Sequence, residues 1–460
     1  MPRRASGRMA PAESNDFAVS VAKKLGADEA VTMTVVSNER MARFANSSVT
    51  VTKTINESGM MVYLAKGGRR IIGSSSNPEK TSLAKFVGLL CKSMMSIPKD
   101  ESYVPLPPKG RRFSSKPRYD RRLERAEDLL TGYAGDAIDA AEGAGAKRAA
   151  GSLEAGVVSH YIAASNGTAG EEASSKILLN IRAFTDRDAS GHGLSCSADV
   201  KGFHPDIAGA RAGAHSKSMR NAGELREPGS TFSILMSPTV ASNLLGLVGD
   251  LASAFSIEAG TSYLVGKMGK KVASSQLDLT DMSSGDGCLQ PRSFDDEGQP
   301  TGSTKLIERG VLKSYLHNLS TAKRFKTRTT GNAGLIEPGP WNIEVGEGDS
   351  SYDEMVKEMK LGLVLTSNWY TRFKNYRTGE FSTVPRDGTY LVKSGRVEEP
   401  IKGIRISDSL ERMFSSIRLL SKDREWIQWW EVDTPTLCPW VLVDGVTVTK
   451  AYGDTPAPAG

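Results

Sequence analysis

The chain has 460 residues, of which 39% are hydrophobic and 24% charged, and its formal net charge is +6. At about 150 residues per domain, this length suggests about three domains and a core that needs no disulfides or metals. The composition excludes a disordered protein, and no run of about 18 apolar residues predicts a membrane-spanning helix. Arg3-Arg4 precedes no apolar run, so no secretory signal is expected. The four cysteines form no CxxC pair. We therefore expect a cytoplasmic protein with reduced thiols that does not contact a membrane.

The first part of the chain predicts helices packed on antiparallel strands. We expect a disordered tail over residues 1–13 and then a helix over 16–25, which Gly26 ends. Residues rich in Val, Thr and Met then predict several strands and a helix, which together make an N-terminal α+β domain over residues 14–104. The expected strands cover 31–36, 40–45, 49–55, 60–64 and 70–74, and the expected helix covers 78–94.

Residues 105–125 change in character and predict a basic linker. Eight cations stand here against only Asp120 and Glu124. A nucleic-acid-binding arm is one interpretation. A solvated linker is favoured, because only Phe113 and Tyr119 offer rings for base stacking, and nucleic acid is therefore not expected as a partner. The cations are Lys109, Arg111, Arg112, Lys116, Arg118, Arg121, Arg122 and Arg125.

The rest of the chain predicts two further units. A helix over 127–141, an antiparallel meander over 147–200 and a helix over 207–221 make a central α+β domain at 126–225. A larger mixed β domain follows over 226–455. In it, Ser237 is expected to cap a helix over 238–255, and 441–449 is expected to form a final strand. The fold class is therefore α+β.

The histidines predict no metal site. None of the five is followed by Glu, so the sequence has neither an HExxH nor an HExxxH zinc motif, and no two share ligand spacing on a helix. His192 lies in Ser190-Gly-His-Gly193, which reads as a flexible loop. We therefore expect no metal ligand and no cofactor in this chain.

Two further patterns could carry chemistry. Ser320-Thr-Ala-Lys323 matches the SxxK motif of serine acyl-transfer enzymes, but the SDN and KTG motifs that support it are missing. Asp281, Asp286, Asp295 and Asp296 could hold Mg²⁺ or Ca²⁺, although local turn hydrogen bonds are the favoured interpretation. We assign no catalytic residue.

Aromatic residues concentrate near the C-terminus. Trp369, Tyr370 and Arg372 lie in one short segment, and Trp426, Trp429 and Trp430 lie in another. Such residues are enriched at interfaces and in clefts, but they could equally form a core. The sequence leaves both interpretations open.

Five segments together resemble the TldD/PmbA family over residues 30–450. Each is weak alone, and their order and spacing carry the resemblance. The segment that begins at Phe294 continues into Leu306-Ile-Glu-Arg-Gly-Val-Leu-Lys-Ser-Tyr-Leu316. The segments are Arg43-Phe-Ala-Asn46, Ala164-Ser-Asn-Gly167, Phe294-Asp-Asp-Glu-Gly298, Thr330-Gly-Asn-Ala333 and Arg377-Thr-Gly-Glu-Phe-Ser382.

The resemblance implies one of two kinds of subunit. TldD-type chains carry HExxxH and bind zinc for peptide hydrolysis, whereas PmbA/TldE-type chains lack the motif. Here Gly246 and Leu247 fall about where the first His and the Glu would lie. Cys438 is not read as the zinc cysteine of the family. The resemblance therefore implies a TldE-like chain that forms a cytoplasmic heterodimer with a TldD-like zinc subunit and acts on unfolded peptides.

Two rival hypotheses stay open at this point. One is a non-catalytic binding or regulatory homodimer without a peptidase partner, and the other is an independent hydrolase that uses Ser320 and Lys323. The residues that we expect to bind substrate or partner are Trp369, Tyr370, Arg372, Asp295, Asp296 and Asn332.

Overall fold

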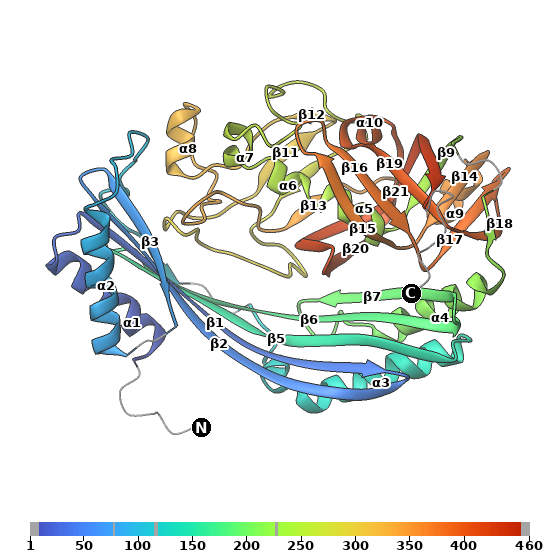
Figure 1. Ribbon diagram of the computed structural model, residues 1–460, viewed down its shortest axis with the longest axis horizontal. Helices are drawn as coiled ribbons and strands as arrows, with labels where there is room; N and C mark the ends of the chain where they lie inside the picture. Colours follow the sequence, from blue (N-terminus) through green and yellow to red (C-terminus); the bar gives the residue numbers. More distant parts are fainter. Residues whose placement is uncertain (1–8, 77–78, 115–117, 226–228, 452–460) are drawn as a thin grey trace, which may run out of the picture.

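The computed structural model describes residues 9–76, 79–114, 118–225 and 229–451. Its strands form a seven-stranded sheet in the N-terminal half and a fourteen-stranded mixed sheet in the C-terminal half. Figure 1 shows the N-terminal sheet as a long curved layer with the C-terminal half above it. The predicted α+β class is confirmed.

The N-terminal sheet has the strand order β3-β2-β1-β5-β6-β4, and β7 also pairs with β6. Its main strands are long, antiparallel and joined by tight turns. These strands are β1 (Glu29–Ala45), β2 (Ser48–Lys66), β3 (Arg69–Ser75), β5 (Arg148–Ala164), β6 (Ala169–Asp186) and β7 (Ala189–Ser197). The short β4 (Arg112–Ser114) instead pairs in parallel with β6.

Two pairs of helices cover this sheet. One pair, α1 and α2, packs on one end of the sheet, around Val62 and Leu64 of β2 and Leu83 of α2. The other pair, α3 and α4, packs farther along around Leu153, Leu179 and Ile181. The helical segments are α1 (Pro11–Lys24), α2 (Lys80–Met94), η1 (Arg121–Arg125), α3 (Glu127–Gly143), α4 (Pro205–Ser218) and η2 (Met219–Asn221).

The N-terminal elements are longer than their local signals predicted. Helix α1 begins at Pro11, so the expected tail is shorter than 13 residues, and residues 1–8 lie outside the described part. Pro11 occupies the first turn, where proline costs no hydrogen bond. The strands predicted separately over 31–36 and 40–45 are one strand, β1, because pairing with β2 and β5 on both sides carries the polar residues between them.

The stretch expected to be a solvated linker instead runs along the N-terminal sheet. Arg112 of β4 pairs in parallel with Ala169 of β6, and the backbone N–H of Arg118 donates to the carbonyl of Ala173 at 2.9 Å. Leu123 of η1 is fully buried. Lys116 lies outside the described residues. The difference arises because an otherwise unpaired part of a sheet edge satisfies the backbone of this segment.

One sheet also crosses the boundary predicted between the first two domains. β1 and β5 pair from Val31↔Ala164 to Phe44↔Gly151. The division into domains stays a prediction, but strands from 14–104 and 126–225 share one hydrogen-bonded layer.

The C-terminal half is built around strands β9 and β21, which pair antiparallel at the centre of the mixed sheet. Its strands are β8 (Gly223–Glu224), β9 (Thr231–Met236), β10 (Leu279–Asp281), β11 (Thr304–Glu308), β12 (Val311–Leu312), β13 (Ile343–Val345), β14 (Leu361–Leu365), β15 (Asn368–Asn375), β16 (Glu380–Pro385), β17 (Thr389–Lys393), β18 (Arg396–Lys402), β19 (Ile404–Ser409), β20 (Ile417–Trp429) and β21 (Val432–Lys450). Its helices are α5 (Pro238–Leu245), α6 (Val248–Leu251), α7 (Ala254–Glu258), α8 (Leu319–Arg324), α9 (Tyr352–Lys357) and α10 (Leu410–Ser415).

The helix predicted over 238–255 is broken into α5, α6 and the start of α7. Ser237 caps α5 as predicted, because its hydroxyl accepts the backbone N–H of Val240 at 3.4 Å. The break after Ala252 has a tertiary cause. Leu316 exchanges backbone hydrogen bonds with Ala252 and Ala254, both at 2.9 Å, and this pairing competes with the helical hydrogen bonds.

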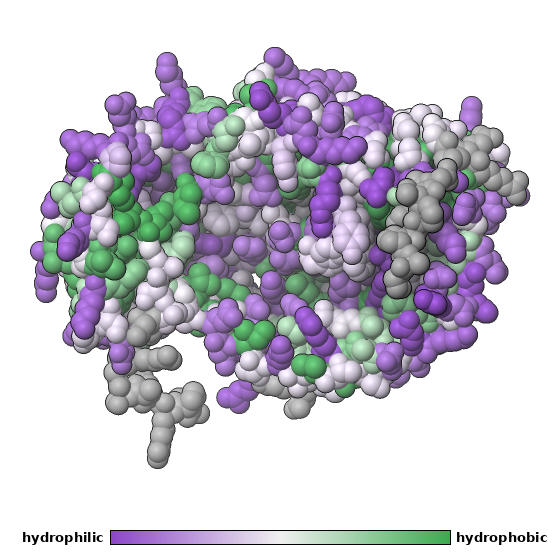
Figure 2. Space-filling model, viewed as in Figure 1, coloured by the Kyte–Doolittle hydropathy of each residue, from purple (hydrophilic) through white to green (hydrophobic). Residues whose placement is uncertain are grey.

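The two halves meet along the inner face of the N-terminal sheet, which is the face opposite α3 and α4. Arg182 and Asp387 form one ion pair across this junction, and Glu172 and Arg292 form another. Figure 2 shows the molecule hollowed between the sheet and the C-terminal half, with both hydrophilic and hydrophobic side chains around the opening. None of the helices in the described part of the chain is both long and apolar enough to cross a membrane.

Candidate functional site

Five aromatic side chains meet beside the junction of the two halves. The ring centroid of Trp369 lies 5.8 Å from that of Trp429 and 5.1 Å from that of Trp430. His192 of β7 lies 4.8 Å from Trp429, and Tyr370 lies 6.1 Å from Trp430. Trp429 is 7% exposed, whereas Tyr370 and Trp430 are 53% and 47% exposed. This aromatic cluster is therefore part core and part open surface, and both interpretations of the sequence apply to it.

Glu431, at the turn between β20 and β21, holds β15 in place. Its side chain is 3% exposed and accepts the backbone N–H of Tyr370 at 2.8 Å and of Thr371 at 3.1 Å. Its carboxylate also lies 3.6 Å from the guanidinium of Arg372. These bonds support the positive φ of Tyr370, +55°, which a non-glycine residue rarely adopts. Tyr370 and Arg372 are thus presented by a fixed backbone.

Asp387 is a second buried carboxylate beneath the aromatic cluster. It accepts from Nε and Nη2 of Arg182, at 3.0 and 2.8 Å, and from the hydroxyl of Ser190 at 2.5 Å. The indole N–H of Trp369 donates to its other oxygen at 3.1 Å. Sequence reasoning missed this residue, because Asp387-Gly388 looks like an ordinary turn. The partners Arg182 and Ser190 lie about 200 residues earlier, and only the fold brings them close.

His192 lies in strand β7 and not in a flexible loop as expected. Its Nδ1 is 2.9 Å from the hydroxyl of Ser367, and its Nε2 is 3.1 Å from the amide oxygen of Asn180. Burial lowers the pKa of His192 to about 4, so the ring is neutral at pH 7. Ser367 is itself fully buried, which leaves no room for a carbonyl substrate at its hydroxyl. This Ser–His–Asn arrangement therefore holds β7 against the C-terminal half.

A pocket of about 400 Å³ opens next to the aromatic cluster, between the β20–β21 turn and the inner face of the sheet. Its floor follows the sheet register. Arg43, Ser152 and Asn180 are direct neighbours across β1, β5 and β6, and Glu154 and Leu178 are direct neighbours two residues along. We call it the sheet pocket; it is lined by Arg43, Ser152, Glu154, Leu178, Leu179, Asn180, Gln428, Trp429, Trp430, Val432 and Asp433.

The other three predicted site residues form a separate buried loop network. Asp295 is fully buried and accepts the backbone N–H groups of Glu297, Gln299 and Ala333 at 2.8–3.1 Å. Asn332 is also fully buried, and its Nδ2 donates to Asp281 at 2.5 Å. The structure therefore brings these residues together as groups that order the loops, and their contact with a substrate or partner stays a prediction.

Asp296 belongs to the same network through an ion pair. Its carboxylate lies 3.6 Å from Arg292, whose guanidinium also stacks 4.6 Å from the ring centroid of Trp341. Asp295 makes the local turn hydrogen bonds expected for these loop carboxylates, to the backbone N–H groups of Glu297 and Gln299. Asp281 does not, because its partners Asn332 and Trp341 lie more than 50 residues farther along the chain.

Glu297 gives the loop network a pH dependence. Burial, and then the neighbouring Asp295, raises the pKa of Glu297 to about 8 from its ordinary value near 4.5. A carboxyl whose pKa is raised on folding binds more protons in the native state, so its contribution to stability falls as the pH rises from 4.5 to 8. Glu297→Gln should therefore raise the thermal midpoint at pH 8.5 by about 2–4 °C and leave it little changed at pH 4. Scanning calorimetry at both values measures this.

The control for Glu297 is the exposed carboxylate Glu57 of β2. In Glu57→Gln, the difference between the thermal midpoints at pH 4 and pH 8.5 should equal that of the unaltered chain. A Glu297→Gln protein with the same pH profile as the unaltered chain would rule out this titration.

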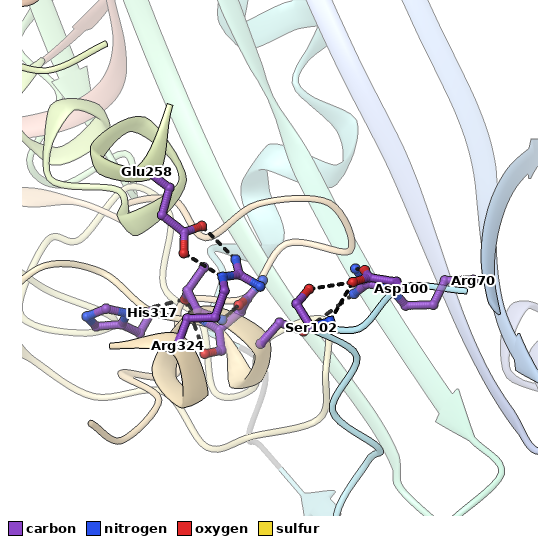
Figure 3. Close-up of polar contacts among 9 residues, drawn as sticks. Arg70, Asp100, Ser102, Glu258, His317 and Arg324 are labelled. Atoms are coloured by element: carbon purple, nitrogen blue, oxygen red, sulfur yellow. Dashed lines mark hydrogen bonds and ion pairs between the residues drawn. The ribbon is translucent and has the colours of Figure 1, made fainter. Parts of the chain in front are cut away.

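Ser320 lies where the N-terminal end of the sheet approaches α8. Its hydroxyl is 3.4 Å from Nη1 of Arg70, and Arg70 also pairs with Asp100 (Figure 3). Arg324 of the same helix turns to Glu258, which it contacts at 2.5 and 2.6 Å. A guanidinium stays protonated and cannot take the serine proton. No hydrogen bond joins Ser320 to Lys323 within the described ranges, so the geometry gives the SxxK hypothesis no support.

Comparison with known proteins identifies the C-terminal half. Residues 229–450 match the family model described as the PmbA/TldA metallopeptidase C-terminal domain. These residues form a PmbA/TldD-family domain. The resemblance to this family is thereby confirmed for the three predicted segments that lie within these residues, which begin at Phe294, Thr330 and Arg377.

Curated relatives with metalloprotease names agree with this assignment. The chain is 28% identical over 208 residues to the metalloprotease MJ0996 of Methanocaldococcus jannaschii, and 28% identical over 193 residues to the metalloprotease PmbA of Escherichia coli O157:H7. These matches cover 43% and 42% of this chain and 45% and 41% of the relatives. The matched part therefore spans less than half the length of each relative.

Solved structures extend the likeness of fold to nearly the whole chain. TldE from Thermococcus kodakarensis superposes with a TM-score of 0.83 at 18% identity, covering 95% of this chain and all of that one. A Thermotoga maritima protein described as a modulator of a DNA gyrase also gives 0.83, at 24% identity, with 95% and 99% covered. At these identities the likeness shows the PmbA/TldD-type fold alone.

The metallopeptidase name raises the question of a zinc site, and the residues of α5 and α6 do not fit one. A Cβ atom on Gly246 would lie 2.6 Å from Oγ1 of Thr436 and 2.7 Å from the carbonyl oxygen of Ser242. The last residue of an HExxxH motif begun at Gly246 would be Leu251, which is 4% exposed within the main core. No histidine side chain has room at the first position, and none stands at the last.

The thiols add no ligand set in this PmbA/TldD-family domain. Cys438 is fully buried, and its burial raises the pKa of its thiol to about 12. Across the residues that the structure describes, no group of three or more His, Cys, Asp or Glu side chains is placed to hold a metal ion.

Proposed function

We propose that this chain is a TldE/PmbA-like subunit, with no metal of its own, of a heterodimeric zinc metallopeptidase that degrades unfolded peptides. The observation that carries the proposal is the packing at Gly246, where the family motif would place a zinc-binding histidine but a single added carbon already collides with Thr436. Relatives called PmbA and TldD, and the TldE fold, agree with it.

In this proposal the zinc belongs to a TldD-like partner that carries HExxxH, and the complex works in the cytoplasm. This chain completes the chamber and supports the catalytic subunit. Tyr370 and Arg372 are available for contact with the partner, because both are exposed on a backbone that Glu431 holds in place. Exposed aromatic and arginine side chains are the types that anchor interfaces.

Purification of the tagged chain from its native source under mild conditions tests the proposal. We expect an equimolar partner whose mass-spectrometric sequence contains HExxxH, zinc in the complex, and hydrolysis of an unfolded peptide by the complex but not by this chain alone. Arg372→Glu should weaken the complex about tenfold or more, because it places a second negative charge beside the buried carboxylate of Glu431.

The exposed Lys24 on α1 provides the matched charge reversal, and Lys24→Glu should leave the complex intact. A chain that purifies only as a homodimer would contradict the proposal and favour a non-catalytic binding or regulatory role. Hydrolysis by the isolated chain that Ser320→Ala abolishes would favour the independent hydrolase.

A further inference from the structure

The sheet pocket holds charged side chains that the fold leaves unpaired. Arg43 and Glu154 rise from the inner face of the N-terminal sheet, and Asp433 follows the β20–β21 turn. Within the described ranges, no hydrogen bond or ion pair is found for the charged end of any of the three. Two carboxylates and one guanidinium give the lining a net negative charge, which favours a cationic group in the pocket.

Two buried polar atoms of the same lining also lack partners. The amide oxygen of Gln428 and the indole nitrogen of Trp429 have no hydrogen-bond partner within the described residues, and Trp429 is 7% exposed. Buried polar groups in folded proteins are nearly always paired, so an unpaired acceptor next to an unpaired donor needs an explanation. A peptide bond offers the matching pair, since its N–H donates and its carbonyl accepts.

The wall of the sheet pocket formed by β20 is held in place at Gln428, whereas Trp430 at the edge of the pocket is exposed. Cys196 of β7 bonds to the backbone of Gln428, with its sulfur 3.3 Å from the carbonyl oxygen and 3.4 Å from the nitrogen. Trp430, next in the chain to Trp429, is 47% exposed. An exposed indole face beside carboxylates attracts lysine and arginine side chains through the cation–π interaction.

We propose that the sheet pocket binds an extended peptide segment that carries a lysine or arginine side chain. Glu154 and Asp433 attract the cation and Trp430 flanks it. Arg43 donates to a peptide carbonyl. The polar atoms of Gln428 and Trp429 are enclosed in the free protein and bond to the main chain of the peptide once their side chains turn toward the pocket. A volume of about 400 Å³ lies in the range of small ligand sites, about 300–1,000 Å³. The inference rests on the proposed function, to which it adds a peptide-contacting subsite in this chain.

The test uses the isolated full chain and two blocked pentapeptides of alanine, one with a central lysine and one with a central glutamate. We expect the lysine peptide to bind about tenfold more tightly than the glutamate peptide by titration calorimetry at low salt. The double variant Glu154→Gln, Asp433→Asn should reduce this ratio to about twofold or less. Trp430→Ala should weaken the lysine peptide about fivefold.

Asp16→Asn on α1, an exposed carboxylate at the far end of the molecule, is the matched control and should keep the preference (Figure 1). Circular dichroism shows whether each variant is folded. Absence of binding at about 1 mM peptide, or a preference that survives the double variant, would overturn the inference. The binding assay needs no partner, so it is independent of the test of the proposed function. If the chain captures an HExxxH subunit but shows no peptide binding, or a preference that survives the double variant, the proposed function stands and the pocket assignment fails.

Discussion

Replacing Arg292 by leucine is expected to lower the free energy of unfolding by about 3–5 kcal/mol. The side chain of Arg292 is 5% exposed, and its Nε donates to Glu172 at 2.8 Å. The same guanidinium lies 3.6 Å from Asp296. Without it, the buried carboxylate of Glu172 and the largely buried carboxylate of Asp296 lose the cation that they share. The cost comes from those uncompensated charges and much less from the contact itself.

The urea midpoint and the thermal midpoint measure the effect of Arg292→Leu. The matched control is Arg211→Leu, since Arg211 and Glu425 also join the two halves of the chain, at 2.8 Å, but are 49% and 38% exposed. That pair should be worth about 1 kcal/mol or less. If the two variants lost equal amounts of unfolding free energy, burial would not be the reason for the cost of removing Arg292.

Introducing a histidine at Gly246 is expected to destabilise the chain by about 1–3 kcal/mol and to recruit no zinc. The first carbon of any side chain there would lie 2.6 Å from the hydroxyl oxygen of Thr436. The backbone of Gly246 is ordinary right-handed helix, with φ −59° and ψ −38°, so the cost is one of space and not of conformation. The imidazole would have to displace β21, which lies at the centre of the C-terminal sheet.

Two measurements check this prediction. Thermal denaturation should place Gly246→His well below the unaltered chain, whereas Gly132→Ala in α3 should be neutral or slightly stabilising, because nothing lies within 4 Å of a Cβ there. Metal analysis of the double variant Gly246→His, Leu247→Glu after dialysis against zinc should find no stoichiometric zinc. A tightly bound ion in that variant would show that the site retains the geometry of a zinc centre.

Much of the secondary structure follows from local signals. The turn at Asn166-Gly167 correctly separates β5 from β6, and the helix over 207–221 corresponds to α4 and η2. The broken helix after Ser237 could not be predicted, because its interruption depends on Leu316, a residue more than 60 positions away that bonds to Ala252 and Ala254. Local propensity carries no information about such a partner.

The residues of the candidate site also fall into those that the sequence indicated and those that it did not. Residue type alone indicated Trp369, Tyr370 and Arg372, and these do gather at one place. Nothing local indicated Asp387, Glu431 or Glu154, because each is an isolated acidic residue in an ordinary turn or strand. Their positions depend on register and on contacts between segments that are distant in sequence.

The sequence by itself determined the α+β class, the family of the C-terminal half and the absence of an HExxxH motif. These features follow from the order and periodicity of the residues, which do not depend on long-range contacts. Only the tertiary structure decided that Gly246 has no room for a side chain and that Arg292 neutralises buried carboxylates. It also decided that unpaired charges and unpaired buried polar atoms share one pocket. Close packing, burial and convergence are properties of atoms in space, and a linear pattern does not specify which atoms become neighbours.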